Sequence, residues 1–167
     1  MLIIMDCDIA STFAKIDRIA LLKKAFPKSD ICITNSVYTE LLRAKRIGFS
    51  FPDKILDDVM QIALRAEEIE YFRMFSQDDR IHAGEAEGLA IAKVRSAVFL
   101  TNDSQVVRFC EENGIKVMDL KDVLMVIGEK GIVDKREMAA ILTKIELKDN
   151  TTIKGKEEVI ELFDKKK

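Results

Sequence analysis

The feature that most constrains this chain is a series of short apolar runs separated by segments with helical spacing of their apolar residues. Four such runs occur, at Leu2–Met5, Ile31–Thr34, Val98–Thr101 and Ile115–Met118. A strand buried on both faces of a sheet has this continuous apolar character. Strands that alternate with helices predict a three-layer α/β/α fold with a central parallel sheet of about four to five strands.

The segments between these runs predict helices, because their apolar residues recur every three or four positions. We expect Asn35 or Ser36 to cap the second of these helices. The alternation of Ile69, Tyr71 and Arg73 suggests a further short strand within residues 67–76. The expected helices span residues 11–25, 36–46, 53–66, 85–94, 104–113, 120–130, 134–147 and 156–163.

The composition and the N-terminal residues limit the classes of protein to which this chain can belong. The chain has 167 residues and a net charge of −2, and no apolar run approaches the roughly 20 residues needed to span a bilayer. The opening MLIIMDCD lacks the basic start and longer apolar core of a secretory signal, which predicts a cytoplasmic protein without a membrane anchor. Cys7, Cys32 and Cys110 are far apart and are expected to be reduced and mostly buried thiols. Because His82 is the only histidine, most histidine-based metal sites are excluded. His82 itself is interpreted as a loop residue.

Acidic residues follow the predicted strands where active sites of parallel sheets form. Asp6 comes directly after the first strand, Asp103 follows the strand at 98–101, and Glu40 lies one turn into the helix after the second strand. Glu85 and Glu87 lie in the first turn of the helix that precedes the Asp103 strand. Any one of these acids could be a helix cap or a solvated side chain. Together at one sheet edge they would repel one another unless a cation held them, and oxygen ligands favour Mg²⁺ or Mn²⁺.

These motifs, taken in order, resemble the PIN-domain family. LIIMDCDIASTFAKIDRIALL resembles its first motif, SVYTELL its second, GEAEGLAIAK its third and FLTND its fourth. The resemblance covers about residues 1–132 and is nearest to VapC-like proteins of prokaryotes and archaea. We therefore expect a PIN-like nuclease domain at 1–132 and a C-terminal helical extension at 133–167, packed on or beside it.

The resemblance implies a Mg²⁺- or Mn²⁺-dependent ribonuclease with one or two ions, commonly a homodimer and often a toxin held by an antitoxin protein. Asp6, Glu40, Glu85 and Asp103 are then the expected catalytic, metal-binding acids. Glu87 is close enough in sequence to replace or assist Glu85.

Three further residues are expected to support the site. Thr101 and Ser104 flank Asp103 and could orient it or a water molecule. Asp8 occupies a position where the family usually has a small hydroxyl residue or alanine. It is either an additional ligand or, as we favour, the cap of the following helix.

Basic residues are expected to guide the RNA backbone, and the Arg43, Lys45 and Arg46 cluster is the favoured contact with phosphate. Lys15 and Arg108 are further candidates, although each of these five residues alone could belong to a solvated charged face. Aromatic candidates for base stacking are few, and Tyr38, Tyr71 and Phe72 are interpreted mainly as core or dimer-surface residues.

Two alternatives remain open. The DCD sequence after an apolar strand resembles the nucleophile motif of haloacid-dehalogenase-like phosphatases, with Asp6 as nucleophile, but Ile9 and Ala10 replace that family's Gly-Thr. The chain could also be a weakly active RNA-binding module.

Overall fold

The computed structural model describes residues 1–150 and 152–165 and contains a five-stranded, fully parallel sheet. The strand order is β3-β2-β1-β4-β5, so the chain builds one half of the sheet outward from β1 and then returns to build the other half. The strands are β1 (Leu2–Met5), β2 (Asp30–Thr34), β3 (Met60–Ile62), β4 (Val98–Leu100) and β5 (Lys116–Met118). The predicted three-layer α/β/α architecture with a central parallel sheet is therefore confirmed.

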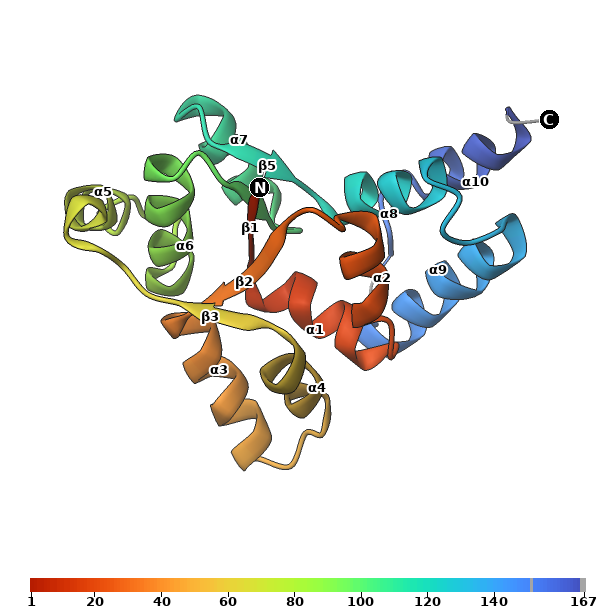
Figure 1. The fold of residues 1–167 in the computed structure, drawn as a ribbon, viewed down its shortest axis with the longest axis horizontal. Coiled ribbons are helices and arrows are strands. Elements are labelled where there is room, and N and C mark those ends of the chain that lie inside the picture. The colour runs from red at the N-terminus through yellow and green to blue at the C-terminus, as the bar shows by residue number, and fades with distance from the viewer. Residues whose placement is uncertain (151, 166–167) are drawn as a thin grey trace.

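Helices cover both faces of this sheet. In Figure 1, α5 and α6 lie on one side of β1, whereas α1, α2 and α8 lie on the other, and α3 and α4 project below the sheet. The helices are α1 (Cys7–Lys15), α2 (Ile19–Ala25), α3 (Asn35–Arg46), α4 (Phe51–Asp58), α5 (Ile69–Phe75), α6 (Ala83–Val94), α7 (Ser104–Glu112), α8 (Leu120–Glu129), α9 (Lys135–Asp149) and α10 (Lys156–Asp164), with a short 3₁₀ turn at Ala66–Glu68.

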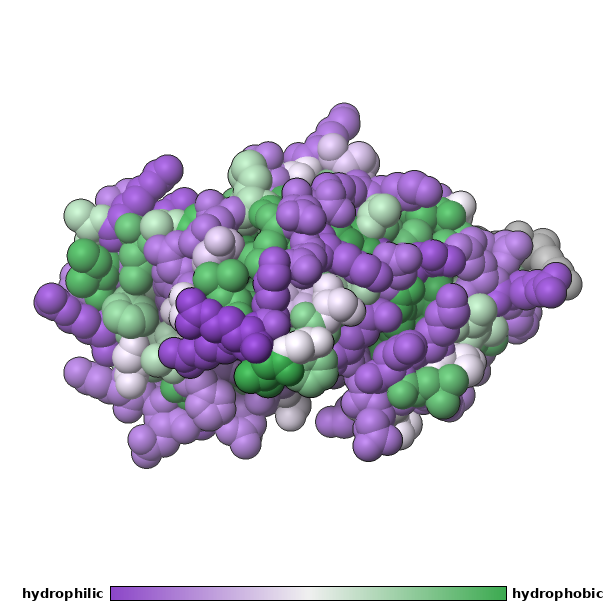
Figure 2. Space-filling model, turned by 90° about the horizontal axis from the view of Figure 1, so that it is seen from below, coloured by the Kyte–Doolittle hydropathy of each residue, from purple (hydrophilic) through white to green (hydrophobic). Residues whose placement is uncertain are grey.

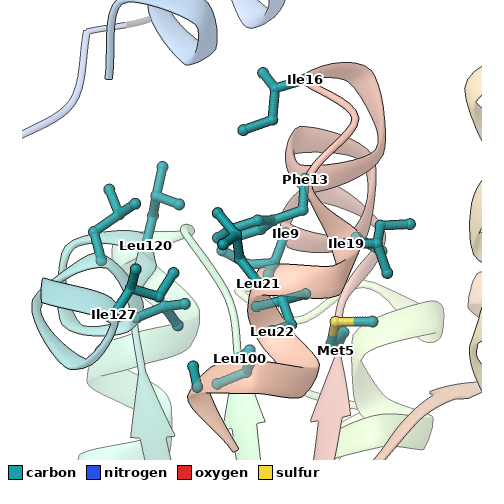
Figure 3. Close-up of a cluster of buried hydrophobic side chains, with 14 of the residues drawn as sticks. Met5, Ile9, Phe13, Ile16, Ile19, Leu21, Leu22, Leu100, Leu120 and Ile127 are labelled. Atoms are coloured by element: carbon teal, nitrogen blue, oxygen red, sulfur yellow. The ribbon is translucent and has the colours of Figure 1, made fainter. Parts of the chain in front are cut away.

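Each face of the sheet has its own hydrophobic core. Figure 3 shows the larger core, in which Phe13 of α1, Leu22 of α2 and Ile127 of α8 gather above Met5 and Leu100 of the strands. The smaller core joins α6 and α7 to the opposite face. Successive strand residues point to opposite faces, so Ile3 belongs to one core and Ile4 to the other. This two-sided burial explains the continuous apolar runs in the sequence.

The predicted single helix at 11–25 is wrong, because the chain forms two helices with a break between them. Asp17 at the break has φ = 60°, in the left-handed region that ends a right-handed helix. A short polar side chain tolerates this conformation better than most. Both helices still turn an apolar side toward the same core, so their periodicity looked continuous.

The predictions of a helix at residues 53–66 and of a short strand within residues 67–76 are also wrong. Helix α4 ends at Asp58, and Met60–Ile62 forms the edge strand β3 beside β2. An edge strand is less buried than an inner strand, and Met60 of β3 is 56% exposed. The sequence of β3 therefore lacks the continuous apolar run that marks the inner strands. Residues 69–75 form helix α5 rather than a strand, and Phe75 is its buried anchor.

Helix α3 is capped one residue earlier than expected. The Thr34 hydroxyl at the end of β2 accepts a hydrogen bond from the Val37 N–H, and Asn35 and Ser36 lie inside the helix. The passage from β2 to α3 therefore needs no loop, which holds the start of α3 close to the sheet edge.

The C-terminal helices join the larger core rather than standing apart from it. Ile145 of α9 and Val159 of α10 are fully buried in the same cluster as Phe13. Of the predicted extension at 133–167, residues 151, 166 and 167 lie outside the described part. Within the described residues, no helix is both long enough and apolar enough to cross a membrane.

Candidate functional site

The site is built at the carboxyl ends of the two central strands, β1 and β4. Asp6 follows β1 and its backbone N–H donates to the Leu100 carbonyl at 3.0 Å, which ties the ends of both strands together. Asp103 lies just beyond β4. The helix after β1 covers one face of the sheet and the helix after β4 covers the other, so these acids lie at the point where the sheet changes direction, where ligands of α/β sheets usually bind.

Both aspartates are fixed as helix caps. The Asp6 carboxylate accepts a hydrogen bond from the Ile9 N–H at 2.8 Å at the start of α1, and Asp6 itself is only 7% exposed. The Asp103 carboxylate accepts one from the Gln105 N–H at 2.7 Å at the start of α7. Asp8, the favoured cap of α1 in the sequence analysis, is instead an exposed residue in the first turn, so that expectation is corrected.

Thr101 connects the two aspartates. Its hydroxyl is fully buried, bonds to the Asp6 carboxylate and accepts the Asp103 N–H at 3.2 Å. A hydroxyl can donate one hydrogen bond and accept others, so one side chain orients both acids. Ser104 is exposed and has no hydrogen bond of this kind in the described structure.

Glu40 and Glu85 complete a cavity of about 180 Å³ beside Asp6. Glu85 lies in the first turn of α6, where its carboxylate accepts the His82 N–H at 2.8 Å. Glu40 approaches from α3 and packs against Gly84. A Cβ at position 84 would lie 2.8 Å from the Glu40 Oε1 atom, so any larger residue there would require the Glu40 carboxylate to move. Asp6, Asp8, Glu40 and Glu85 therefore line one cavity, with Phe99 and Gly88 among its other walls.

Gly84 is one residue of this site that was not identified from the sequence. A glycine at a helix start, directly before a candidate acid, is the only signal that could have suggested it.

The acids interact electrostatically. Burial raises the pKa of Asp6 to about 7, assisted by the charges of Asp8 and Glu85 and opposed by the hydrogen bonds from Thr101 and Ile9. Burial also raises the pKa of Glu85, and the charges of Asp103 and Asp8 act in the same direction. Asp8 and Glu85 are therefore close enough to disfavour the ionised form of Asp6, and Asp8 and Asp103 are close enough to disfavour that of Glu85.

The donor set fits a hard divalent cation. Every acid of the cavity offers carboxylate oxygens, and in the described residues no lysine or arginine forms an ion pair with Asp6, Asp8, Glu40 or Glu85. Within residues 1–150 and 152–165, no three acidic, histidine or cysteine side chains already converge closely enough to hold an ion. Mutual repulsion and the helix-capping bonds explain why these side chains surround the cavity rather than meet at one point.

Glu87 faces away from this cavity. It is 5% exposed, and its Oε2 atom accepts the Ser36 N–H at 2.8 Å, which ties α6 to the start of α3. Successive helix residues are rotated by about 100°, so Glu85 and Glu87 lie on nearly opposite sides of α6. His82, an exposed residue before α6, does line the acidic cavity.

The candidate RNA-contacting residues divide into two groups. Lys15 is paired with Asp149 at 2.6 Å, Lys45 with Asp53 at 2.5 Å and Arg108 with Glu112 at 3.0 Å, so their charges are partly neutralised within the chain. Arg43 and Arg46 on α3 form no ion pair in the described structure. Figure 2 shows the side toward which α3 and α4 project, and hydrophilic residues cover most of that face.

The three cysteines have no disulfide partner, as expected. Burial raises the pKa of Cys7, at the cavity wall, to about 12, and the Glu40 charge acts in the same direction. A thiol in this state is a poor nucleophile at neutral pH.

Comparisons with known proteins identify a protein family and solved structures to which this chain is similar. The family model of the PIN domain matches residues 2–162. No curated protein shows a significant match.

Solved structures share the fold at low sequence identity. The structure of VapBC2 from Rickettsia felis bound to a DNA fragment from their promoter matches with a TM-score of 0.59 and 14% identity, over 71% of this chain and 98% of that one. VapBC-1 from nontypeable Haemophilus influenzae matches with a TM-score of 0.57 and 12% identity, over 71% and 98%. A PilT N-terminus domain protein from the archaeon Sulfolobus solfataricus gives a TM-score of 0.53 and 14% identity, over 78% and 94%.

Proposed function

The chain belongs to the PIN-domain family, and from this premise we propose that it is a metal-dependent endoribonuclease. The observation that carries the proposal is the cavity at the ends of β1 and β4, which Asp6, Glu40 and Glu85 line without an ion pair to any lysine or arginine of the described residues. Phosphodiester hydrolysis is the chemistry that such a cavity serves best, because a polyanionic substrate cannot approach clustered carboxylates unless a cation offsets their charge.

We assign the metal-binding role to Asp6, Glu40, Glu85 and Asp103. A bound Mg²⁺ or Mn²⁺ would activate water and neutralise charge on the phosphodiester. The hydrogen bond from Ser36 to Glu87 supports Glu85 as the acid of α6 that faces the ion. Asp8 lines the same cavity and is proposed as an outer residue of the site.

The chain's own residues supply the rigidity of the site. Thr101 holds Asp6 and Asp103 in fixed orientations, and Gly84 allows Glu40 to lie against α6. Groups that are already oriented lose little entropy when substrate binds, which is a general source of catalytic rate.

We also propose that a partner protein controls the site, as an antitoxin would. Two structures with this fold are of VapBC assemblies, which supports a toxin role, and a homodimer is proposed on the family resemblance.

The test is cleavage of a mixed RNA pool with Mn²⁺, with Mg²⁺ and with a chelator. Asp6→Asn and Asp103→Asn should each abolish metal-dependent cleavage, because the amide loses the charge but still caps its helix. Asp79→Asn is the matched control, since Asp79 is exposed and lies outside the cavity, and it should cleave like the wild type.

Full activity in the Asp6→Asn/Asp103→Asn double variant would contradict the assignment. Hydrolysis of p-nitrophenyl phosphate that is lost in Asp6→Asn would favour the phosphatase alternative. Tight RNA binding without cleavage under every metal condition would favour the binding module.

A further inference from the structure

A groove runs between the two C-terminal helices and is separate from the acidic cavity. It has a volume of about 390 Å³, and all of its described lining residues belong to α9 or α10. In Figure 1 these two helices lie at the end of the molecule opposite α5 and α6. We call this hollow the α9–α10 groove. None of its described lining residues also lines the acidic cavity, so its role is separate from the proposed chemistry.

The apolar lining of the groove comes from both helices. It consists of Ala139 and Leu142 of α9 and Ile160 of α10. Leu142 is buried, Ile160 is half-buried against the larger core, and Ala139 is exposed. Leu147 lies one helical turn beyond Thr143, another lining residue of α9, and is 76% exposed. The apolar surface therefore continues along α9 past the end of the groove.

The charged lining of the groove is mainly acidic. Glu146 and Lys156 form an ion pair at 2.9 Å that links the two helices, so their charges offset each other. Glu157 and Glu161 of α10 are exposed and form no ion pair in the described part of the chain. The groove therefore retains two negative charges without an ion pair. Such a surface repels nucleic acid and attracts a cationic partner.

The two sides of the groove differ in charge, which determines how a partner would be oriented. The two acids without an ion pair are both on α10, whereas α9 carries the exposed residues Arg136, Lys144 and Lys148 outside the groove. A partner that lies in the groove would therefore turn its basic residues toward α10.

The shape of the groove favours a helical partner. The backbone groups of α9 and α10 are bonded within their own helices, so an extended peptide would find no strand edge with which to pair. Two adjacent helices instead present ridges of side chains between which a third helix can pack. A groove bounded by two helices is also open along its length, unlike the concave pockets that surround small molecules.

We propose that the α9–α10 groove docks a basic amphipathic helix of a partner protein. Apolar residues on one side of that helix pack against Ala139, Leu142 and Ile160. Its lysine or arginine residues face Glu157 and Glu161. This inference does not depend on the proposed nuclease function, and it gives the C-terminal helices a binding role.

The experiment uses the full chain with three synthetic peptides. The probe is a fluorescein-labelled peptide of about 18 residues, or about five helical turns, with leucines at helical spacing on one side and lysines beside them. A second peptide has glutamate in place of each lysine, and a third has the residues of the probe in an order without an apolar stripe. Fluorescence anisotropy measures binding, and the methyl NMR signals of Leu142 and Ile160 report whether the probe lies in the groove.

One pair of variants tests whether the probe occupies the groove. Ala139→Arg places a bulky cation in the groove, and Ala140→Arg is the matched control at an exposed position of α9 outside it. Ala139→Arg should weaken binding by more than about tenfold, because the arginine fills the groove and repels the lysines of the probe. If thermal unfolding shows that Ala139→Arg misfolds, Thr143→Arg blocks the same groove from another exposed position.

A second pair of variants tests the acids. Glu157→Gln/Glu161→Gln should weaken binding about three- to tenfold, the scale of two exposed ion pairs, and should reduce its salt dependence. Glu70→Gln/Glu111→Gln changes the net charge equally and is the control. Both of its residues are exposed, lie on α5 and α7, and form no ion pair in the described structure. This control should bind the probe like the wild type.

The lysine probe should bind the wild type more tightly than either of the other peptides and should shift the Leu142 and Ile160 signals. Equal binding of the lysine and glutamate peptides would overturn the proposal, as would unchanged binding in folded Ala139→Arg and Thr143→Arg proteins. Self-association of the chain that is lost in Ala139→Arg but retained in Ala140→Arg would assign the groove to a second copy instead. RNA cleavage is measured separately, so a failure of the nuclease function would leave the docking result standing.

Discussion

At the scale of single residues, burial of Asp6 disfavours the ionised carboxylate that the proposed metal site requires. Its carboxyl group is almost completely buried at the end of β1, where burial raises its pKa from 3.8 to about 7. The folded protein therefore retains a proton at Asp6 under conditions in which the unfolded chain has released it. Stability that depends on this proton is fully present below about pH 4 and is lost as the pH rises through about 7.

We predict that Asp6→Asn stabilises the metal-free protein, and more so at pH 8 than at pH 4. The amide cannot ionise, yet it can still accept the Ile9 N–H. The gain at pH 8 is expected to be on the order of 2–4 kcal/mol, since one pKa unit corresponds to about 1.4 kcal/mol. Thermal unfolding in chelator at several pH values measures it.

Asp79→Asn, at an exposed position, should show no such pH dependence. A stability difference between Asp6→Asn and wild type that stays constant from pH 4 to pH 8 would contradict the burial argument. Added Mn²⁺ should stabilise the wild type more than the variant, because only the wild type offers the charged ligand.

At the scale of elements, the ion pair between Glu68 and Arg95 connects the segment between β3 and α5 to the end of α6. Glu68 is fully buried and bonds to Arg95 at 2.5 Å, and the Arg95 guanidinium also donates to the Ala63 carbonyl at 3.0 Å. Burial alone would raise the pKa of Glu68, but the hydrogen bonds from Arg95 and from the Arg65 backbone N–H outweigh it and lower that pKa. Arg95 and the Arg65 backbone N–H thus favour the ionised form of this buried carboxyl group.

We predict that Arg95→Met destabilises the protein by about 3–5 kcal/mol, the usual cost of leaving a buried charge without its partner. Urea unfolding at pH 7 provides the measurement. Arg73→Met is the matched control, because Arg73 is an exposed residue of α5 with no ion pair in the described structure. Equal unfolding midpoints for these two variants would show that the Glu68–Arg95 ion pair does not stabilise the protein.

At the scale of the whole molecule, the C-terminal helices share a core with the N-terminal ones. Asp149 at the end of α9 accepts hydrogen bonds from Thr12 and Lys15 of α1, and Ile145 is fully buried in the core that contains Phe13. Residues separated by more than a hundred positions therefore fasten the two ends of the chain together. This arrangement favours one cooperative unit over two.

We predict that Ile145→Ala lowers the free energy of unfolding of the entire protein by about 2–5 kcal/mol, as truncation of a buried side chain usually does. Leu147→Ala on the same helix should change it by less than about 0.5 kcal/mol, because Leu147 is 76% exposed. Circular dichroism and intrinsic fluorescence should report the same shifted transition. Two separate transitions in Ile145→Ala would mean that α9 unfolds independently of the sheet.

The sequence determined those features that depend on burial along the chain. β1 and β4 lie between two helical layers, so every residue in them must be apolar and the runs are visible in the letters. The placement of Asp6 directly after β1, and of Asp103 shortly after β4, at one edge of the sheet also follows from chain order alone, because parallel strands end at the same edge. β3 was not predicted because it lies at the sheet edge and is mostly exposed. α1 and α2 were predicted as one helix because both present an apolar side to one core.

Only the tertiary structure decided toward which partner or cavity each acidic side chain is directed. Glu85 and Glu87 have similar sequence contexts, but the rotation between them turns Glu85 toward the cavity and Glu87 toward Ser36. The pairing of Lys15 with Asp149 likewise depends on a contact between distant helices. Periodicity reports which side of an element is buried, whereas the partner of each polar group depends on how the elements pack against one another, and no local pattern in the sequence records that.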